Sequence, residues 1–450
     1  MAHRMQAPSV MQQTMLSTVV FGVAALLVLT PTRPAEAEVP AQTNAPSKAG
    51  SDYGPDIADE LGDEAVKANP SIAAITHGVD ALKQRVSGAG AWMDPIFSAE
   101  YSNMPIDSPV PGSHPMSGIQ LMLKQTFYWP GKIRAREEEA KSLVRERQNA
   151  LAEQKVQLRA AVRLAYYRLA LTRQLREVTQ AHVKLVGDFI QVVRVKNEAG
   201  VAAQHEYLRL RVLAEQLQDD LNNFDQDEQS LTATINSTLH RALGTPVPTP
   251  KQTTLRGAIP DVPSLVRRAE RERPLLNQYR AEAAAHRAAA RRAEREGYPD
   301  ITLWAGYRIR TAAGTDPGTD FASVGVAVPL PFWYDRRWGS KSREQAELAA
   351  AATERRAAEL DGMRGQLGRV VAAWKRAEQE ARTYRDQLTP AARLSLQATF
   401  ASYQVDRADF ASLFQAEVQL LNFERTTRMA EANAAEARVQ ADAIVGSGVK

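Results

Sequence analysis

The chain repeats one sequence pattern at a spacing of 204 residues. Three anchors of the first copy recur in the second, with Ala65, Pro70 and Pro95 returning as Ala269, Pro274 and Pro299. In each copy, two alternating segments follow the anchors and lead into one very long helical segment. Solenoid repeats have periods of roughly 20–50 residues, so this is not a solenoid. The sequence predicts two structural halves fused in one chain.

The N-terminus has the order of a secretory signal peptide. Arg4 precedes an apolar run from Val19 to Leu29, and Ala35-Glu36-Ala37 follows. The run is shorter than the roughly 20 residues that a transmembrane anchor needs. We therefore expect residues 1–37 to be a cleaved signal peptide and residues 38–57 a flexible leader. The sequence contains no cysteine, so neither a disulfide nor an acylated N-terminal cysteine is expected, and the protein is not predicted to be a lipoprotein.

Each copy contains two segments in which apolar and polar residues alternate. Phe97, Ala99 and Tyr101 alternate with polar neighbours, and the pattern returns from Ile301 to Ile309. This period of two predicts one β-hairpin over about 96–129 and another over about 300–330. Strands of about ten residues, apolar on one face only, suit a membrane β-barrel. Ordinary hairpins packed on a soluble core are the alternative.

The helical segments are exceptionally long. Residues 133–199 contain no proline, and a helix of that length reaches about 100 Å. The chain then returns to about Leu243, crosses a proline-rich linker at 244–264 and resumes over 265–296. The second half goes out over 340–405 and back over 408–446, and we expect helix 58–90 to complete its return. Apolar residues recur in narrow stripes at steps of three, four and seven, which predicts helices packed side by side as in coiled coils.

Charge and motif patterns exclude several functions. The net charge is +4, but basic and acidic residues are interspersed along the helices, so no nucleic-acid partner is predicted. The seven histidines are dispersed, without an HxxxH or HExxH pair. No phosphate-binding loop, dinucleotide fingerprint or nucleophile elbow is present. We therefore expect that the protein is not an enzyme and that it binds neither a cofactor nor a metal.

At three places the residues resemble the TolC-like outer membrane efflux proteins, and more loosely their cation-efflux branch. These places are the segment from Gln125 to Lys132, Ala199-Gly200-Val201-Ala202 with Leu208, and the segment from Tyr403 to Phe414. Each motif is short, and it is their order, spacing and duplication that make the resemblance specific. The resemblance covers nearly all of the chain after the leader.

The resemblance implies a mainly α protein with a membrane β-barrel portion. Four strands from each of three chains would close a twelve-stranded barrel in the outer membrane, and duplicated helical hairpins would form a trimeric α-barrel tunnel in the periplasm. The expected domains are a first repeat over 58–243, an equatorial linker over 244–264 and a second repeat over 265–447. The implied function is a passive exit duct for metal cations or drugs. A periplasmic adaptor and an inner-membrane pump of the resistance-nodulation-division type are the implied partners of the homotrimer.

The same resemblance suggests the site residues. Trp129, Pro130 and Gly131 correspond to the strand-to-helix junction. Two tips, at about 199–202 and 405–408, correspond to the adaptor contact through Gly200, Val201, Ala202, Arg407 and Ala408. Asp406 and Asp409 are candidates for an acidic constriction at the tunnel entrance, and the alternative is that they are N-cap residues of a helix.

Two other functional classes remain compatible with the sequence. A periplasmic adaptor also carries a long helical hairpin, but with compact half-motifs on either side of a single hairpin. A coiled-coil scaffold without a pore is the second alternative. Only the duct is expected to need detergent for extraction.

Overall fold

The computed structural model describes residues 55–107, 113–250 and 258–446. The predicted signal peptide and the leader up to residue 54 lie outside this part of the chain, as do residues 251–257 of the predicted linker and residue 447 of the second repeat.

The leader was predicted to run to residue 57, but helix α1 (Pro55–Ala68) already begins at Pro55. The second repeat also begins earlier than predicted. Helix α5 (Val262–Glu272) starts inside the predicted linker, because the Asp261 carboxylate caps it by accepting a hydrogen bond from the backbone N–H of Ser264 (3.1 Å).

The helix that precedes the strands in each half is split at a proline. Helix α1 is followed by α2 (Pro70–Ala89), and α5 by α6 (Pro274–Glu296). The single residue between the two helices, Asn69 or Arg273, has extended backbone angles. A proline disfavours helical angles in the residue before it, which ends the first helix there. The sequence predicts unbroken helices over 58–90 and 265–296, so these two breaks differ from the expectation.

The long helices differ between the halves. In the first half, α3 (Lys132–Glu198) is unbroken over 67 residues, and α4 (Gln204–Thr238) returns along it. In the second half, the helix that leaves the sheet begins with a π-helical turn, η1 (Asp335–Gly339). It continues through α7 (Ser340–Thr383), a second π-helical turn η2 (Tyr384–Leu388) and α8 (Thr389–Gln404), and α9 (Phe410–Val445) returns along it. Pro390 has no N–H to donate to the preceding turn, and the wider turn η2 accommodates this loss.

The described strands form one antiparallel sheet in the order β1 (Ile96–Ser102), β2 (Gly118–Phe127), β3 (Ile301–Arg310) and β4 (Phe321–Ala327). The hairpins of the two halves join through β2 and β3, where Leu121 pairs with Tyr307. Leu123 pairs with Phe97 on one side and with Ala305 on the other, and Ala305 pairs with Val324. This register places most of the apolar residues of the four strands on one face, with Ile96, Met122, Trp304 and Phe321 as exceptions on the other. Most residues of the opposite face are polar or small, including Ser98, Gln120, Lys124, Thr302, Arg308 and Ser323.

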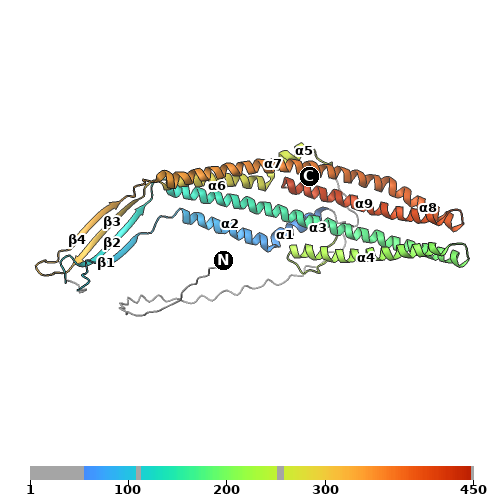
Figure 1. The fold of residues 1–450 in the computed structure, drawn as a ribbon, viewed down its shortest axis with the longest axis horizontal. Coiled ribbons are helices and arrows are strands. Elements are labelled where there is room, and N and C mark those ends of the chain that lie inside the picture. The colour runs from blue at the N-terminus through green and yellow to red at the C-terminus, as the bar shows by residue number, and fades with distance from the viewer. Residues whose placement is uncertain (1–54, 108–112, 251–257, 447–450) are drawn as a thin grey trace, which may run out of the picture. The chain divides into compact units, whose positions relative to one another are not determined.

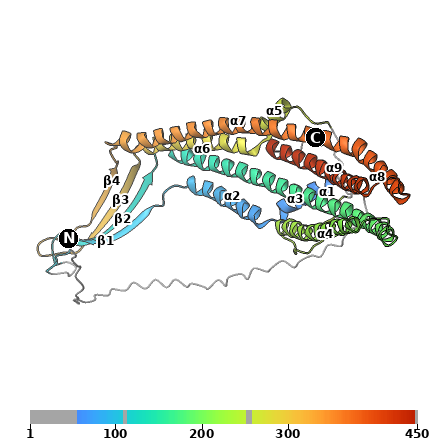
Figure 2. The same cartoon turned by 45° about the vertical axis from the view of Figure 1, so that its right-hand side comes forward.

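The helices lie side by side, and the sheet extends from one end of them (Figures 1 and 2). Beside the strands, α3 packs between α2 and α6, and α6 packs on α7; farther away, α3 packs between α4 and α9, with α8 beyond α9. Asn69 Nδ2 donates to the carbonyl of Thr238 (2.9 Å), so α2 continues the line of α4. Gly446 lies against Arg273 and Pro274, so α6 continues the line of α9. The sequence-based pairing of the return helices was therefore wrong, because each half completes its return with its own N-terminal helices.

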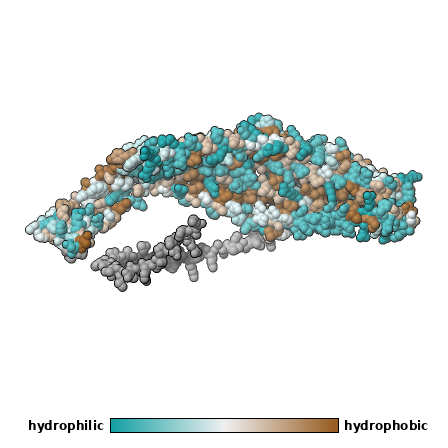
Figure 3. Space-filling view, viewed as in Figure 1, coloured by the Kyte–Doolittle hydropathy of each residue, from teal (hydrophilic) through white to brown (hydrophobic). Residues whose placement is uncertain are grey.

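Apolar side chains close the seams between the helices. Val162 and Leu169 on α3 are buried, as are Leu210, Leu213 and Leu217 on α4, which matches the predicted stripes. Figure 3 shows apolar residues along the middle of the helices and hydrophilic residues along their edges. Among the described helices, none has a run of apolar residues long enough to cross a bilayer.

Candidate functional site

The strand-to-helix junction of the first half is held by Trp129, Pro130 and Gly131. Gly131 has φ = +91°, a left-handed conformation that glycine adopts without steric cost, and α3 starts at the next residue. The backbone N–H of Trp129 donates to Asp300 Oδ1 (2.8 Å), and the buried Lys132 ammonium contacts the same oxygen (2.8 Å). These contacts fasten the start of α3 to the residue before β3, so the two halves share one junction.

Aromatic side chains surround the junctions between strands and helices in both halves: Trp92, Phe127, Tyr128, Trp129, Tyr298, Phe332 and Trp333. Trp92 packs on Phe127 and Tyr128, with ring centroids 6.2 and 6.0 Å apart, while Trp129 stacks on Tyr298 at 5.7 Å. Phe332 and Trp333 pack on each other and are largely exposed. The end of the sheet that meets the helices thus carries a collar of aromatic rings.

A partly buried ion pair between Arg136 and Glu296 lies beside this aromatic collar. The Arg136 guanidinium donates two hydrogen bonds to the Glu296 carboxylate (2.5 and 2.9 Å) and lies 4.4 Å above the Tyr128 ring. The hydrogen bond to Glu296 raises the pKa of Arg136 above its ordinary value, although partial burial opposes this. Because Arg136 is on α3 and Glu296 ends α6, the pair holds the two halves together beside the sheet.

The first helical tip turns at Gly200. Helix α3 ends at Glu198, and Gly200 has φ = +76°. The N–H of Val201 donates back to the carbonyl of Lys196 (2.9 Å), and that of Gly200 to Asn197 (3.0 Å), which is the usual glycine-terminated helix end. Val201 is exposed at the turn.

The second tip makes the same turn with a different residue. Asp406 adopts φ = +59°, and the N–H of Arg407 donates to the carbonyl of Ser402 (2.9 Å), as Val201 does to Lys196. Asp409 is the N-cap of α9, and its carboxylate accepts a hydrogen bond from the N–H of Ser412 (2.7 Å). Hydrogen bonds with Ser412 hold the pKa of Asp409 below its usual range. Within one chain, the contacts of Asp409 are therefore those of a helix N-cap, which the sequence analysis gave as the alternative to a constriction.

The two tips contact each other through Lys196 and Glu206, which the sequence analysis did not identify as site residues. Lys196 before the first tip forms an ion pair with Asp406 of the second, and its ammonium lies 5.3 Å from the centroid of the Tyr403 ring. The Tyr403 hydroxyl donates to Glu206 Oε2 (3.0 Å). Burial and this bond to Glu206 raise the pKa of Tyr403. No local pattern in the sequence marks these partners, because they meet only when the two tips lie side by side.

A buried polar cluster connects the halves farther from the tips. His182 on α3 is 3% exposed and bridges two carboxylates of α9, with Nδ1 2.6 Å from Glu417 and Nε2 3.1 Å from Glu424. Arg393 on α8 donates to the other oxygen of Glu424 (2.5 Å). Burial opposes a charge on His182, but the hydrogen bonds to Glu417 and Glu424 outweigh it and raise its pKa to about 9. The protonated imidazole thus joins α3 to α9.

The site residues predicted from the sequence fall into separate places. Trp129, Pro130 and Gly131 lie where the sheet meets the helices, whereas both tips lie at the opposite end of the helices (Figure 1). Among the described residues, no group of three or more histidine or carboxylate side chains is arranged to hold a metal ion. The predicted site residues therefore lie at the two opposite ends of the long helices, the junction at one end and the tips at the other.

One family model matches the chain. Residues 61–245 match the family described as outer membrane efflux protein, and the match covers α2, the first hairpin and both α3 and α4. No curated protein matches the chain.

Several solved structures share the fold. The outer-membrane channel OprN is 17% identical, with a TM-score of 0.73 over 87% of this chain and 90% of that one. The outer membrane protein VceC from Vibrio cholerae is also 17% identical, with a TM-score of 0.72 over 87% of this chain and 97% of that one. The MtrE outer membrane channel of Neisseria gonorrhoeae, in its open state, is 15% identical, with a TM-score of 0.69 over 88% and 90%. At these identities the likeness shows the fold.

Proposed function

We propose that this chain, whose residues 61–245 match the outer membrane efflux protein family, is the exit duct of a tripartite efflux system. The resemblance identified from the sequence is thereby confirmed, and the family is one of channel proteins. In the proposed system an inner-membrane pump of the resistance-nodulation-division type exports metal cations or drugs through a periplasmic adaptor into this duct. The duct itself is passive, and the pump supplies the energy.

The observation that carries this proposal is the two-faced sheet. Its apolar face is uncovered within one chain, with Val324 85% exposed, Phe97 67% and Val326 62%. Burying such side chains in hydrocarbon is favourable, while the residues of the other face suit a water-filled lumen. Lipid is therefore the proposed environment of the apolar face.

The edges of the sheet support a trimer. Strands β1 and β4 each pair on one side only among the described strands. Unpaired backbone N–H and C=O groups are too costly in lipid, so the edges must meet other strands. Three copies provide twelve strands, a number that can close a barrel. The helices would continue from it as a tunnel about 100 Å long in the periplasm.

The aromatic collar supports the same placement. Tryptophan and tyrosine are favoured where a bilayer meets water, because one end of the ring system is apolar and the other polar. The collar separates the apolar face of the sheet from the charged helices. We propose that it lies at the periplasmic surface of the outer membrane.

A matched pair of variants tests the membrane placement. Val324 and Ser323 are adjacent on β4 and face opposite sides of the sheet. Val324→Arg should cost about 2–4 kcal/mol of insertion free energy and remove the protein from outer-membrane fractions, whereas Ser323→Arg should insert normally. Equal insertion of the two variants would contradict a lipid-facing sheet.

The oligomeric state is the second test. The detergent-solubilised protein should have the mass of three chains after the detergent contribution is subtracted. A protein that stays monomeric and soluble without detergent would overturn the duct and favour a scaffold or adaptor.

The tips are the proposed contact with the adaptor. Gly200, Val201, Ala202, Arg407 and Ala408 lie at the reversals of the helices, at the end opposite the sheet. In a duct anchored by its strands, this end is the one that a periplasmic partner can reach. Crosslinking at Val201 should capture the adaptor, and crosslinking in the collar should not.

Asp406 and Asp409 are the proposed entrance constriction. Asp406 is 65% exposed at its side chain and pairs with Lys196 of the same chain. Three copies would gather these carboxylates near one axis, where mutual repulsion favours an open entrance and cations favour closure. The double variant Asp406→Asn and Asp409→Asn should lose cation selectivity in planar bilayers. Unchanged selectivity would leave Asp409 as a helix cap only.

A further inference from the structure

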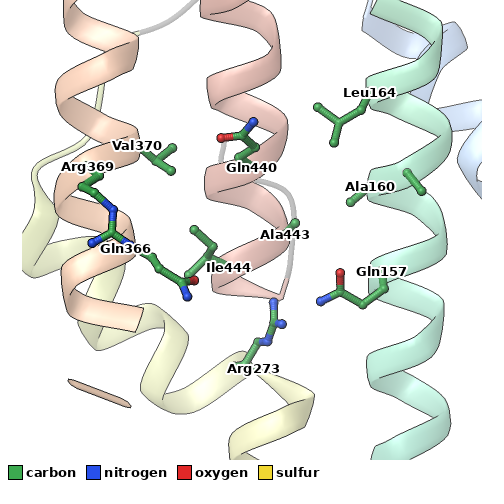
Figure 4. A pocket seen from close by; sticks show the side chains of 11 residues that line it. Gln157, Ala160, Leu164, Arg273, Gln366, Arg369, Val370, Gln440, Ala443 and Ile444 are labelled. Carbon is green, nitrogen blue, oxygen red and sulfur yellow. The ribbon is translucent and has the colours of Figure 1, made fainter. Parts of the chain in front are cut away.

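A cavity lies between α3, α7 and α9 at the level where α9 ends and α6 begins (Figure 4). Its volume is about 470 Å³. Leu164, Val370 and Ile444 form apolar parts of its wall. The wall also carries two guanidinium groups, from Arg273 and Arg369, and the amides of Gln157, Gln366 and Gln440. The cavity is therefore apolar on part of its surface and rich in hydrogen-bond donors on the rest.

Arg273 is buried beside this cavity without enough acceptors. The residue is 6% exposed, and its Nη2 donates to Glu153 Oε1 (2.5 Å). Its Nε and Nη1 are buried and have no hydrogen-bond partner in the described part of the chain. Figure 4 shows the guanidinium directed from the α5–α6 break toward the space between α9 and Gln157. Because a buried charged donor without an acceptor is costly, the position calls for an additional acceptor.

Glu153 cannot supply that acceptor. Its Oε1 also accepts a hydrogen bond from Gln157 Nε2 (2.7 Å), and its Oε2 accepts one from the N–H of Leu275 (3.2 Å). Both carboxylate oxygens are thus engaged in holding α3 to the start of α6. Burial lowers the pKa of Arg273, while the charges of Glu153 and Glu359 oppose this.

Arg369 adds a second positive charge to the wall. It is exposed on α7 and makes no ion pair with a residue of the described chain. Arg369 lines the cavity from α7 and Arg273 from the α5–α6 break, and Gln366 extends from α7 toward Ile444 (Figure 4). Two guanidinium groups on one small cavity favour an anion, and their planar geometry matches a carboxylate.

We propose that this cavity binds a small organic carboxylate. Its carboxylate would accept hydrogen bonds from Arg273 and Arg369, and its apolar body would contact Leu164, Val370 and Ile444. The site lies away from the sheet and from both tips, so it goes beyond the proposed function and does not depend on it. Occupation would satisfy the donors of Arg273 and hold α3, α7 and α9 together where the broken helices meet.

Calorimetric titration of the purified full-length protein in detergent tests the ligand class. The probes are 1-naphthoate, the uncharged 1-naphthamide and inorganic phosphate. 1-Naphthoate should bind at least tenfold more tightly than either of the others. Equal binding of 1-naphthamide would overturn the anion site, and equal binding of phosphate would overturn the need for an apolar body.

Variants locate the binding. Arg369→Gln changes an exposed side chain and should weaken 1-naphthoate binding about tenfold without altering the fold. Arg273→Lys keeps a charge for Glu153 but loses the guanidinium fork, and it should weaken binding at least as much. Arg364→Gln is the matched control, because Arg364 is exposed on the same helix and pairs with Asp361 and Glu270 away from the cavity. Parent affinity in both test variants, or an equal loss in the control, would overturn the proposal.

Discussion

The first half of the molecule, α1 to α4 with its hairpin, and the second half, α5 to α9 with its hairpin, form similar backbones with different side chains. At the helix break, Asn69 caps α2 by accepting from the N–H of Ser71 (2.9 Å) and donates to Thr238 of α4. At the corresponding break, Arg273 instead forms a buried ion pair with Glu153 of the first half. The neutral cap connects helices of the same half, whereas the charged pair connects the two halves.

The tips show the same contrast. Gly200 turns the first tip by backbone freedom alone, while Asp406 turns the second with a side chain that pairs with Lys196 of the first. In both comparisons the second half carries the charge, and its partner is in the first half. The duplication therefore provides the repeated backbone, and the differences between the copies provide contacts that orient one half against the other.

The largest expected effect is at the helix breaks. Arg273→Met should destabilise the protein by about 3–5 kcal/mol, because it leaves the buried Glu153 carboxylate without its cation. Asn69→Ala at the equivalent position should cost about 1 kcal/mol, the usual loss for a cap. Denaturant unfolding of both variants in detergent gives the comparison. Similar costs at the two positions would show that Glu153 does not need Arg273.

The contact of His182 with α9 should make stability depend on pH. Its folded-state pKa of about 9 lies above the ordinary value of 6.5, so folding favours the protonated form. This contribution is fully present below about pH 6.5 and is lost as the pH rises through about 9. The thermal midpoint should fall over that range in the parent and change much less in His182→Gln. A parent midpoint that does not fall would exclude a protonated bridge to Glu417 and Glu424.

Substitution at the first tip should lower the stability by less than Arg273→Met does, but it should abolish efflux. Gly200→Val forces a β-branched residue into a left-handed conformation and should cost about 1–3 kcal/mol locally. We expect efflux to be lost while the trimer and its insertion persist. Gly187→Val, on α3 and outside the tip, is the control, because this glycine has no left-handed backbone and a side chain there meets open space. Efflux that persists at the parent level in Gly200→Val would remove this tip from the adaptor contact.

The smallest effect is expected at the second tip. Asp406→Gly removes the ion pair to Lys196, which is exposed on the Asp406 side and worth at most about 1 kcal/mol. Glycine also removes the steric cost of a Cβ in the left-handed conformation, which should stabilise the fold by about as much as the lost ion pair destabilises it. Stability should therefore stay within about 1 kcal/mol of the parent. A much larger loss would show that the Lys196 pair, rather than the backbone, determines this turn.

The sequence by itself determined the repeated elements of this protein. The alternation around Phe97 and Ile301 marked the strands, and the long segment without proline after Gly131 marked α3. The duplicated Pro70 and Pro274 mark the two helix breaks, although an unbroken helix was predicted across each. These features depend on residues close together in the chain, where steric and hydrogen-bonding rules act directly.

The tertiary structure decided which elements meet. The end-to-end alignment of α2 with α4 and of α6 with α9 reversed the predicted pairing, because two helices of equal length fit the gap equally well by length alone. His182 meets Glu417, and Arg273 meets Glu153, across separations of 235 and 120 residues. No periodicity connects such distant positions. They become partners because packing the apolar seams brings their helices together and excludes water, so that each buried charge requires the opposite charge beside it.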